Sequence, residues 1–286
     1  MTAIILHGHE AAKRMLEEAR QQVRSWTARS HRAPCLGLLA TDTAATGAYL
    51  RRIEEYAVIA GVTIRRVDAG TDAGAAATLA LVAALNGDEG VDGILALKPL
   101  PSGLNISRLA TVIDPAKDVD GMTPANAGRL ALGLDGLFPC TAQAALALAE
   151  EAVGSLCGGR ATVVGASRSV GRPLAELLLQ RGATVTVAHA DTVDLPAACR
   201  TAEILFVAVG RPGLIDHSHV ADGATVIDIG INSVPDGIGG AVIVGDVDLD
   251  SVRSRALAVS AVPDGVGPLT TAFLIRNTLA SAGCHL

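Results

Sequence analysis

The sequence predicts an α/β protein with two units, each built around a parallel sheet. Segments of strand length rich in Val, Ile and Leu alternate with Ala-Leu segments of helical periodicity along most of the chain, which is typical of buried parallel strands with crossover helices. Half of the residues are apolar and only 2% are aromatic, so the core must consist of Ala, Val, Leu and Ile. A chain of 286 residues is long enough for two ordinary units.

The first half of the chain has the strand-helix-strand order that gives a parallel sheet with crossover helices. We expect strands at residues 2–6, 35–40, 62–67 and 91–97 and helices at 10–29, 47–60 and 75–85. Residues 41–46 are expected to form a small polar loop, and Gly61 caps the helix that ends at residue 60. Pro99 and Pro101 force an extended exit from the last of these strands.

The second half repeats the pattern after a polar stretch at residues 113–128. This stretch has too little periodicity for a core element, and a long ordered loop of this kind is often functional. We expect helices at 141–153, 173–180 and 269–282 and strands at 161–164, 184–188, 204–209 and 225–229, with 242–244 extending the same series. The last helix must pack back on another element, so the two predicted units are 1–139 with 269–286, and 140–268.

The most informative stretch is Ala161-Thr-Val-Val-Gly-Ala-Ser-Arg-Ser-Val-Gly-Arg-Pro173. A β-branched run is followed by a glycine turn and by a proline suited to the first turn of a helix. Free backbone N–H groups and the helix dipole at such a turn form an anion site. The spacing differs from Gly-x-Gly-x-x-Gly, and an ordinary strand-to-helix turn is the alternative interpretation.

Two charged residues near this turn favour different nucleotides. Arg168 can bind a phosphate with two hydrogen bonds, with Arg172 beside it, although a solvated surface arginine is the alternative. Asp191 follows the next strand, where an acidic residue commonly binds the ribose of NAD and basic residues select NADP. Asp191 therefore opposes Arg168 in the choice of nucleotide.

Three polar residues follow the strands of the first unit. Tyr49, Lys98 and Asp120 are expected near the carboxyl edge of its sheet, a standard place for a ligand. Tyr49 can stack on a ring or donate through its hydroxyl group, and Asp120 can bind the polar edge of a heterocycle. The alternative for Asp120 is a loop carboxylate that satisfies the N–H groups of its own turn.

Composition and residue spacing argue against nucleic-acid binding, a membrane span, a signal peptide and a metal site. A net charge of -6 gives no reason to expect nucleic acid, and no apolar run reaches the length of a membrane span. The N-terminus lacks the pattern of a signal peptide. Five widely spaced cysteines indicate reduced thiols in a cytoplasmic protein. The histidine pairs 7/9 and 217/219 have no accompanying ligands at suitable spacing, so no metal is expected.

Taken together, these motifs resemble the methylenetetrahydrofolate dehydrogenase/cyclohydrolase family over nearly the whole chain. The matching segments are Lys117-Asp-Val-Asp-Gly121, Gly128-Arg-Leu130, Pro139-Cys-Thr141, the turn described above, Val207-Ala-Val-Gly210, Ile227-Asp-Ile-Gly-Ile-Asn232, Val244-Gly-Asp-Val247 and Val262-Pro-Asp-Gly-Val-Gly-Pro-Leu-Thr270. The resemblance implies a folate-binding α/β domain, a C-terminal Rossmann-like dinucleotide-binding domain and an interdomain cleft. It also implies a homodimer that uses NADP, with NAD as the alternative, and tetrahydrofolate as the substrate carrier.

The resemblance implies roles for residues in both domains. The family oxidises 5,10-methylenetetrahydrofolate to the 5,10-methenyl form and hydrolyses that to the 10-formyl form. Tyr49 and Asp120 are the catalytic candidates, with Lys98 added for its position. The substrate-binding candidates are Tyr49, Leu97, Asp120, Pro263, Asp264 and Gly265, and the cofactor-binding candidates are Gly165, Ser167, Arg168, Ser169, Gly171, Asp191, Gly210 and Ile231.

Three departures from the family pattern bear on the second reaction. The family motif Ser-x-x-Tyr-x-x-x-Lys is Thr46-Gly-Ala-Tyr49-Leu-Arg-Arg-Ile53 here, which puts Ile53 at the position of the catalytic lysine. Leu97 replaces the supporting glutamine, and Asp264 replaces a glycine of the folate loop, where it is either a base or a charge that repels folate. Lys98 is one residue from the glutamine position, and neighbours in a strand point to opposite faces.

The departures predict the loss of one of the two reactions. Hydride transfer depends mainly on positioning, whereas hydrolysis of the methenyl cation requires water activation and a proton shuttle, which isoleucine cannot provide. We therefore expect an NAD(P)-dependent methylenetetrahydrofolate dehydrogenase, with NADP preferred for Arg168, whose cyclohydrolase activity is lost or impaired. The alternatives are a specialised paralog that performs another one-carbon reaction, and a silent folate- or nucleotide-binding partner of an active relative.

Overall fold

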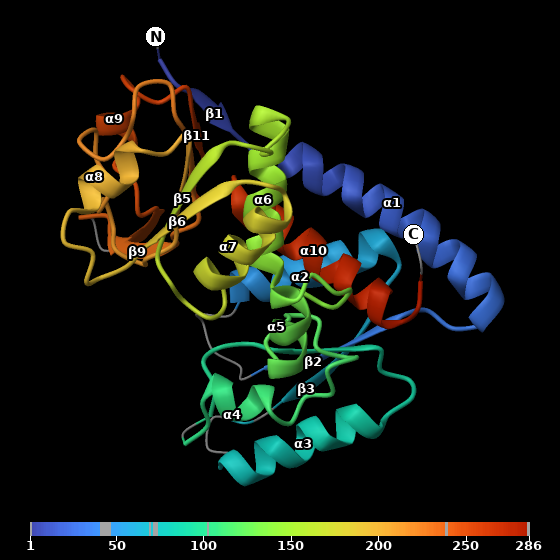
Figure 1. The fold of residues 1–286 in the computed structure, drawn as a ribbon. Coiled ribbons are helices and arrows are strands. Elements are labelled where there is room, and N and C mark those ends of the chain that lie inside the picture. The colour runs from blue at the N-terminus through green and yellow to red at the C-terminus, as the bar shows by residue number, and fades with distance from the viewer. Residues whose placement is uncertain are drawn as a thin grey trace. The chain divides into compact units, whose positions relative to one another are not determined.

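The computed structural model describes residues 2–40, 47–68, 70, 74–101, 103–237 and 240–284. The predicted loop at 41–46 lies outside these residues. The chain forms two compact units (Figure 1). Met1–Ala12 and Thr141–Thr270 make up the first, called the six-stranded unit, and Lys13–Cys140 and Thr271–Leu286 make up the second, called the three-stranded unit.

The six-stranded unit is built on one parallel sheet with the strand order β1-β11-β8-β7-β5-β6. Its strands are β1 (Ile4–Leu6), β5 (Arg160–Val164), β6 (Thr184–Ala188), β7 (Ile204–Val207), β8 (Thr225–Asp228) and β11 (Ala258–Ser260). The central strands β7 and β8 are buried throughout, as expected for a parallel sheet covered on both faces. Val207, Val226 and Val259 belong to its aliphatic core.

Helices connect these strands. They are α6 (Cys140–Val153), α7 (Gly171–Gln180), α8 (Leu195–Arg200) and α9 (Leu249–Val252). The buried face of α7 includes Leu174, Leu177 and Leu178, which have the spacing of an amphipathic helix. The two short helices escaped prediction; Asp194 and Asp248 cap them by accepting hydrogen bonds from N–H groups of their first turns.

Two strand predictions were wrong in this unit. Residues 242–244 do not extend the main sheet, because β10 (Ala241–Val244) pairs antiparallel with β9 (Asn232–Pro235) in a separate hairpin. The first strand, β1, pairs with β11, near the other end of the chain, and not with the next strand along the sequence (Figure 1). The sequence analysis assigned residues 1–12 to the predicted unit 1–139. In the structure they belong to the same unit as residues 141–270.

The three-stranded unit has the parallel strand order β3-β2-β4. The strands are β2 (Cys35–Ala40), β3 (Thr63–Asp68) and β4 (Gly93–Ala96). β2 lies in the middle and is buried along its whole length. The helices are α1 (His9–Ser30), of which residues from Lys13 belong here, α2 (Gly47–Ala60), α3 (Ala75–Gly87), α4 (Ile106–Ala110), α5 (Pro124–Ala131) and α10 (Val266–Ser281), of which residues from Thr271 belong here.

The polar stretch 113–128 contains the start of a helix that composition alone concealed. Pro124 occupies the first turn of α5, and the Thr123 hydroxyl group accepts a hydrogen bond from the N–H group of Asn126 at 3.3 Å. Asn126 and Leu130 are buried. The expectation that this stretch forms no core element was therefore wrong from residue 124 onward, because capping and two buried residues outweigh the polar composition. Ile113 and Val119, before the helix, are buried as well.

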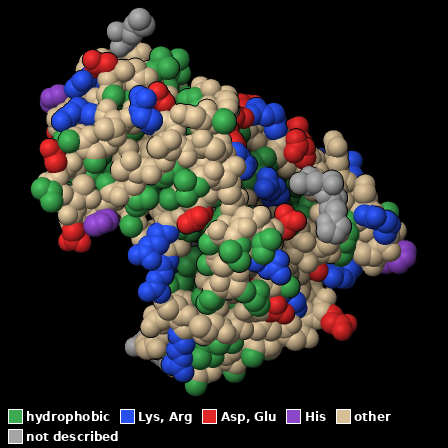
Figure 2. Space-filling view, in the orientation of Figure 1, with side chains coloured by type: hydrophobic (Ala, Val, Ile, Leu, Met, Phe, Trp, Pro, Cys, Tyr) green, Lys and Arg blue, Asp and Glu red, His purple; other side chains and the backbone are tan. Residues whose placement is uncertain are grey.

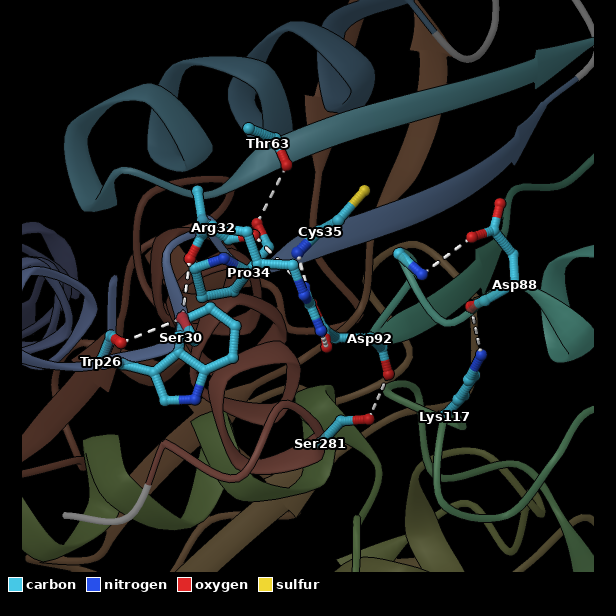
Figure 3. A network of polar contacts seen from close by, with 12 residues as sticks. Trp26, Ser30, Arg32, Pro34, Cys35, Thr63, Asp88, Asp92, Lys117 and Ser281 are labelled. Atoms are coloured by element: carbon cyan, nitrogen blue, oxygen red, sulfur yellow. Dashed lines mark hydrogen bonds and ion pairs between the residues drawn. The ribbon is translucent and has the colours of Figure 1, made fainter. Parts of the chain in front are cut away.

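A polar network ties the ends of several elements of this unit together (Figure 3). The Arg32 guanidinium group binds both carboxylate oxygens of Asp92 at 2.7 Å, and the Asp92 carboxylate also accepts the Cys35 N–H group at 2.8 Å. Arg32 lies over the Trp26 ring, 4.9 Å from its centre. The Ser281 hydroxyl group, from α10, donates to the Asp92 carbonyl oxygen. The network joins α1, β2, the start of β4 and α10.

The surface carries charges of both signs. On the face that Figure 2 shows, Lys and Arg side chains are interspersed with Asp and Glu side chains and with scattered hydrophobic ones. Among the described residues, no helix combines the length and the apolar character needed to cross a membrane.

Candidate functional site

Helix α2 presents the first candidate residue, Tyr49, from its opening turn. Arg52 and Ile53 follow three and four residues later, so all three lie on adjoining parts of the helix surface. Burial raises the pKa of the half-buried Tyr49 phenol, as does the negative charge of Asp120, while the positive charge of Arg52 lowers it. Ile53, which the sequence analysis aligned with the family lysine, is 0% exposed and belongs to the buried face of the helix.

The end of β4 presents Leu97 and Lys98 to different environments. The Leu97 N–H group donates to the Leu39 carbonyl oxygen at 2.9 Å, which continues the pairing of β2 with β4. The Leu97 side chain is buried, whereas Lys98 is exposed. Lys98 therefore does not take the place that Leu97 fills with an apolar side chain.

The segment that carries Asp120 runs beside β4. Ile94 donates its N–H group to the Lys117 carbonyl oxygen at 2.7 Å and forms a parallel bridge with Asp118. This pairing brings Asp120 to the carboxyl end of β4, at the exit that carries Lys98. The charge of Lys98 acts on Asp120 there.

The electrostatics of Asp120 differ from those of its neighbour Asp118. Asp118 is buried and accepts hydrogen bonds from the N–H groups of Met122 and Thr123 and from the Asn126 amide, so it is a structural carboxylate. Asp120 is half-buried, and within the described part of the chain no hydrogen bond or ion pair engages its carboxylate. Burial and the charge of Asp118 raise the pKa of Asp120 to about 7, against the effect of Lys98.

Buried groups hold the Asp120 loop in place. Gly121 has φ 64°, and a Cβ atom there would collide with the backbone of Phe138 and Pro139. The Asn277 amide group of α10 donates to the carbonyl oxygens of Val119 at 2.8 Å and Phe138 at 2.9 Å. The Cys140 thiol donates to Val119 at 3.2 Å, and burial raises its pKa well above the ordinary value.

In the six-stranded unit, the turn after β5 has the geometry of a tight strand-to-helix connection. Gly165 has φ 110°, and Cβ atoms at Gly165 and Gly171 would collide with the carbonyl oxygens of Ala208 and Gly165 respectively. The Ser167 hydroxyl group accepts hydrogen bonds from the N–H groups of Val170 at 3.2 Å and Gly171 at 3.4 Å. The predicted glycine and serine positions of the turn are thus brought together at the start of α7.

Charged side chains surround this turn. Arg168 and Arg172 are exposed, and the Arg172 Nε–H group donates to the Ala166 carbonyl oxygen at 3.0 Å. Ser169 is half-buried in the same turn. Asp191 follows the neighbouring strand β6, and its side chain is 94% exposed, with the His189 imidazole 3.7 Å from its carboxylate. A glycine turn with two guanidinium groups fits the phosphates of a dinucleotide in size and charge.

The remaining cofactor candidates lie further along the same sheet. Gly210, with φ 72°, follows β7, and its N–H group donates to the Asp246 carboxylate at 2.9 Å. Ile231 lies just before β9 and is 57% exposed.

The candidate folate loop 263–265 also belongs to the six-stranded unit, whereas Tyr49, Leu97 and Asp120 belong to the three-stranded unit. The Gly8 N–H group donates to the Asp264 carbonyl oxygen at 2.8 Å, and a Cβ atom at Gly265 would meet the Ala261 carbonyl oxygen. The Asp264 carboxylate lies 3.9 Å from the His9 imidazole, with both side chains about half exposed.

Sequence reasoning assigned no role to several buried residues that position these loops. Asp118 and Cys140 occur inside segments that the sequence analysis singled out, so their segments carried the signal without revealing which side chain is structural. The same holds for Asp228 and Asp246, which lie in the matching segments 227–232 and 244–247, whereas Asn277 could be found only from the hydrogen bonds that the folded chain makes.

These features define an α/β protein with a Rossmann-like parallel sheet, a glycine turn suited to a dinucleotide, and a second parallel-sheet unit. Family models agree. The model for the catalytic domain of tetrahydrofolate dehydrogenase/cyclohydrolase matches residues 6–120, and the model for the NAD(P)-binding domain matches residues 139–286. The chain belongs to the tetrahydrofolate dehydrogenase/cyclohydrolase family.

Individual relatives are similar along the whole chain. The bifunctional protein FolD 2 of Pseudomonas syringae is 43% identical over 282 residues, which cover 99% of this chain and 94% of the relative. The structure of the bifunctional FolD methylenetetrahydrofolate dehydrogenase/cyclohydrolase of Campylobacter jejuni has a TM-score of 0.92 and 35% identity, with 99% and 100% of the two chains covered. The Trypanosoma brucei FolD structure, complexed with NADP and an inhibitor, has a TM-score of 0.92 and 32% identity, with 98% and 97% covered.

Proposed function

We propose that the protein oxidises 5,10-methylenetetrahydrofolate to the 5,10-methenyl form with NADP⁺ and does not catalyse the hydrolysis that follows. The observation that carries the proposal is the side chain at position 53, where the family lysine is replaced by an isoleucine that is 0% exposed. Leu97, at the position of the supporting glutamine, is buried as well. Neither side chain can bind a proton or polarise water.

The residues proposed for substrate binding retain the polar groups that orientation requires. Asp120 accepts hydrogen bonds from the polar edge of the pterin when its carboxyl group is ionised, and Lys98 favours that ionised form. Tyr49 contributes a phenol that stays protonated, because burial raises its pKa. Its ring packs against the folate and its hydroxyl group can donate. These interactions hold the reacting carbon without acid–base chemistry.

We place NADP⁺ at the turn after β5, with Gly165, Ser167, Ser169 and Gly171 around the phosphates. When bound, the cofactor supplies a nicotinamide ring that accepts hydride. Arg168 and Arg172 supply positive charge beside the turn, which favours a nucleotide with an additional phosphate. The Asp191 side chain is 94% exposed, so water can solvate its carboxylate whether or not a nucleotide is bound. We therefore expect Asp191 to favour NAD less strongly than Arg168 favours NADP.

The division of labour between the units follows from these assignments. We assign folate recognition by Tyr49, Leu97 and Asp120 to the three-stranded unit, which corresponds to the predicted domain 1–139 with 269–286 apart from residues 1–12 and 269–270. We assign dinucleotide binding to the six-stranded unit, which contains nearly all of the predicted domain 140–268. The loop 263–265 adds substrate contacts, with Asp264 as its unusual charge. The family resemblance further supports a homodimer, and the five widely spaced free cysteines support a cytoplasmic location. Light scattering of the purified protein tests the dimer.

A turnover assay with purified protein tests the proposal. Methylenetetrahydrofolate is supplied with NADP⁺ or NAD⁺, and reduced nucleotide and methenyl product are followed together by absorbance. We expect NADPH and methenyl product to form in equal amounts, with a higher kcat/KM for NADP⁺. Preference for NAD⁺ would assign the decisive role to Asp191 instead of Arg168.

Two other outcomes contradict the proposal in different ways. Removal of methenyl product faster than its uncatalysed hydrolysis would show that another group, such as Lys98 or Asp264, replaces the lysine. Failure to reduce either nucleotide would favour the specialised paralog. If folate and nucleotide still bound and mixed dimers formed with an active relative, the result would favour the silent partner.

A further inference from the structure

The carboxylate of Asp246 lies 0% exposed at the end of β7, in the six-stranded unit. It accepts hydrogen bonds from three successive backbone N–H groups, those of Val209 at 2.6 Å, Gly210 at 2.9 Å and Arg211 at 2.9 Å. The Asn232 amide group adds a fourth at 2.8 Å. Consecutive N–H groups that converge in this way form an anion-binding concavity, and here a side chain of the protein itself fills it.

A second buried carboxylate holds the first. Asp228, at the end of β8, accepts hydrogen bonds from the N–H groups of Gly230, Asp246 and Val247, each at 3.0 Å. Side chains could not be added around the pair without collision, because Cβ atoms at Gly230 and Gly245 would meet the carboxylates of Asp246 and Asp228. Asp228 therefore fixes the backbone of Asp246, and Asp246 fixes the loop 209–211.

The loop 209–211 lies where a dinucleotide binds in this class of sheet. The strand order places β7 and β6 on opposite sides of β5, which makes the gap between β5 and β7 the topological switch point. The two connections that leave this point touch each other. The Ala208 N–H group donates to the Val164 carbonyl oxygen at 2.8 Å, and a Cβ atom at Gly165 would collide with the Ala208 carbonyl oxygen.

We infer that Asp246 is a positioning residue of the cofactor site, which it maintains by holding the backbone of residues 209–211 against the glycine turn after β5. This inference rests on the proposed use of NADP⁺. The carboxylate is 0% exposed, so it can act on a bound nucleotide only through the backbone N–H groups that it binds. The three N–H groups of the loop 209–211 all bind this one charged group, so loss of the carboxylate frees the whole loop at once. The loop must then be reordered when the nucleotide binds.

The experiment compares Asp246→Asn with the wild-type protein in the dehydrogenase assay. The amide side chain keeps the shape but replaces one acceptor oxygen with a donor, which then faces backbone N–H groups. Loss of one or two bonds to a charged acceptor corresponds to a change of about 10- to 100-fold in an equilibrium constant. We expect the KM and the Kd for NADP⁺ to rise by such a factor, while the KM for methylenetetrahydrofolate stays near the wild-type value.

Two further variants keep the inference testable if Asp246→Asn folds poorly. Asn232→Ala removes only one of the four donors, and we expect a smaller rise in the KM for NADP⁺ with an unchanged unfolding temperature in the absence of ligand. Asp194→Asn is the matched control in the same unit, because its carboxylate caps α8 by accepting the Ala197 N–H group at 2.9 Å. The control is expected to have the wild-type KM for NADP⁺.

The outcomes separate this inference from the proposed function. If the wild-type protein does not bind NADP⁺, the proposed function fails before Asp246 is tested. If the wild-type protein binds NADP⁺ and both Asp246→Asn and Asn232→Ala bind it equally well, the positioning role is wrong. Equal increases in both KM values would indicate a general loss of structure and would also contradict it.

Discussion

At the scale of single residues, the proposal that only one of the family's two reactions is retained depends on the side chain at position 53. Ile53 lies with Leu50 and Ala57 on the buried face of α2, one turn after Tyr49. A lysine at this position would have to place an ammonium group in a space that now holds an apolar side chain. Burial disfavours the charged form and lowers the pKa of such a lysine.

The first prediction concerns Ile53→Lys. We expect this substitution to lower the free energy of unfolding by about 3 kcal/mol or more, because it leaves a buried charge without a partner. The control Ile53→Leu conserves volume and polarity and should cost less than about 1.5 kcal/mol. Urea denaturation measures both. Wild-type stability for Ile53→Lys would show that the site is open to water and that the burial of position 53 does not support the proposed loss of cyclohydrolase activity.

The second prediction concerns the pH dependence of folate binding. Asp120 has its pKa raised to about 7, so its carboxylate form is populated above that pH, and we propose that this form accepts hydrogen bonds from the pterin. The KM for methylenetetrahydrofolate should therefore fall as the pH rises through about 7. Lys98 lowers the pKa of Asp120, so Lys98→Met should move the midpoint to higher pH. An unchanged midpoint would remove Lys98 from the site.

At the scale of secondary-structure elements, the network around Asp92 holds together four segments that are distant in sequence. The Asp92 side chain is only 7% exposed, and the Arg32 side chain that binds it with two hydrogen bonds is 40% exposed. The Lys117 ammonium group adds a second tie between elements, because it donates to the carbonyl oxygens of Leu85, Asn86 and Asp88 at the end of α3.

The third prediction is that Arg32→Met destabilises the three-stranded unit. Removal of the Arg32 guanidinium group leaves the nearly buried Asp92 carboxylate with the Cys35 N–H group as one of its few partners. We expect this to lower the free energy of unfolding by about 1–3 kcal/mol, after allowing for the partial exposure of Arg32. The exposed pair Arg181 and Glu150 supplies the control, since Arg181→Met should cost at most about 1 kcal/mol. Equal urea midpoints for the two variants would contradict this assignment.

Several elements were predictable because their own residues determine them. Residues 35–40, 47–60 and 184–188 form the predicted elements with the same bounds, since periodicity and terminal breakers agree there. The short elements α4, α8 and α9 depend instead on single capping side chains, those of Asn105, Asp194 and Asp248. β11 has only three residues and lies between β1 and β8. A strand of that length has too few residues for a recognisable period.

The candidate site could be predicted from the sequence only where a motif specifies which residue shapes the backbone or is available to a ligand. The glycine turn after β5 formed as its spacing suggested, with Ser167 holding the start of α7. The roles of Asp118, Asp228 and Asp246 were hidden, because each carboxylate acts through hydrogen bonds that are formed only in the folded chain. An aspartate in a polar motif has the same sequence signature whether it binds a ligand or its own backbone.

At the scale of the whole molecule, the first strand of the chain belongs to the sheet whose other strands come from the second half. β1 pairs with β11, and the following helix α1 continues into the three-stranded unit, to which the second part of α10 also belongs. Both units are thus built from segments distant in sequence. A ligand that binds only one folded unit therefore stabilises a structure that is built from two separate stretches of the chain.

The fourth prediction is a nucleotide-dependent gain in stability. NADP⁺ at 100 times its Kd should add about 2.7 kcal/mol to the free energy of unfolding, because it binds only the folded state. NAD⁺ at the same concentration should add less, and Arg168→Ala should remove the difference between the two nucleotides. Thermal unfolding with each nucleotide measures this. The same difference in Arg168→Ala as in the wild type would place the recognition of the additional phosphate elsewhere.

The most direct test of the central claim follows methenyltetrahydrofolate after its formation. The purified protein is given methylenetetrahydrofolate and NADP⁺, and the methenyl product is recorded until the nucleotide is consumed. We predict that methenyl product accumulates in the same amount as NADPH and then declines at the rate measured without enzyme. A faster decline that scales with enzyme concentration would show that cyclohydrolase activity persists without a lysine at position 53, and would contradict the account.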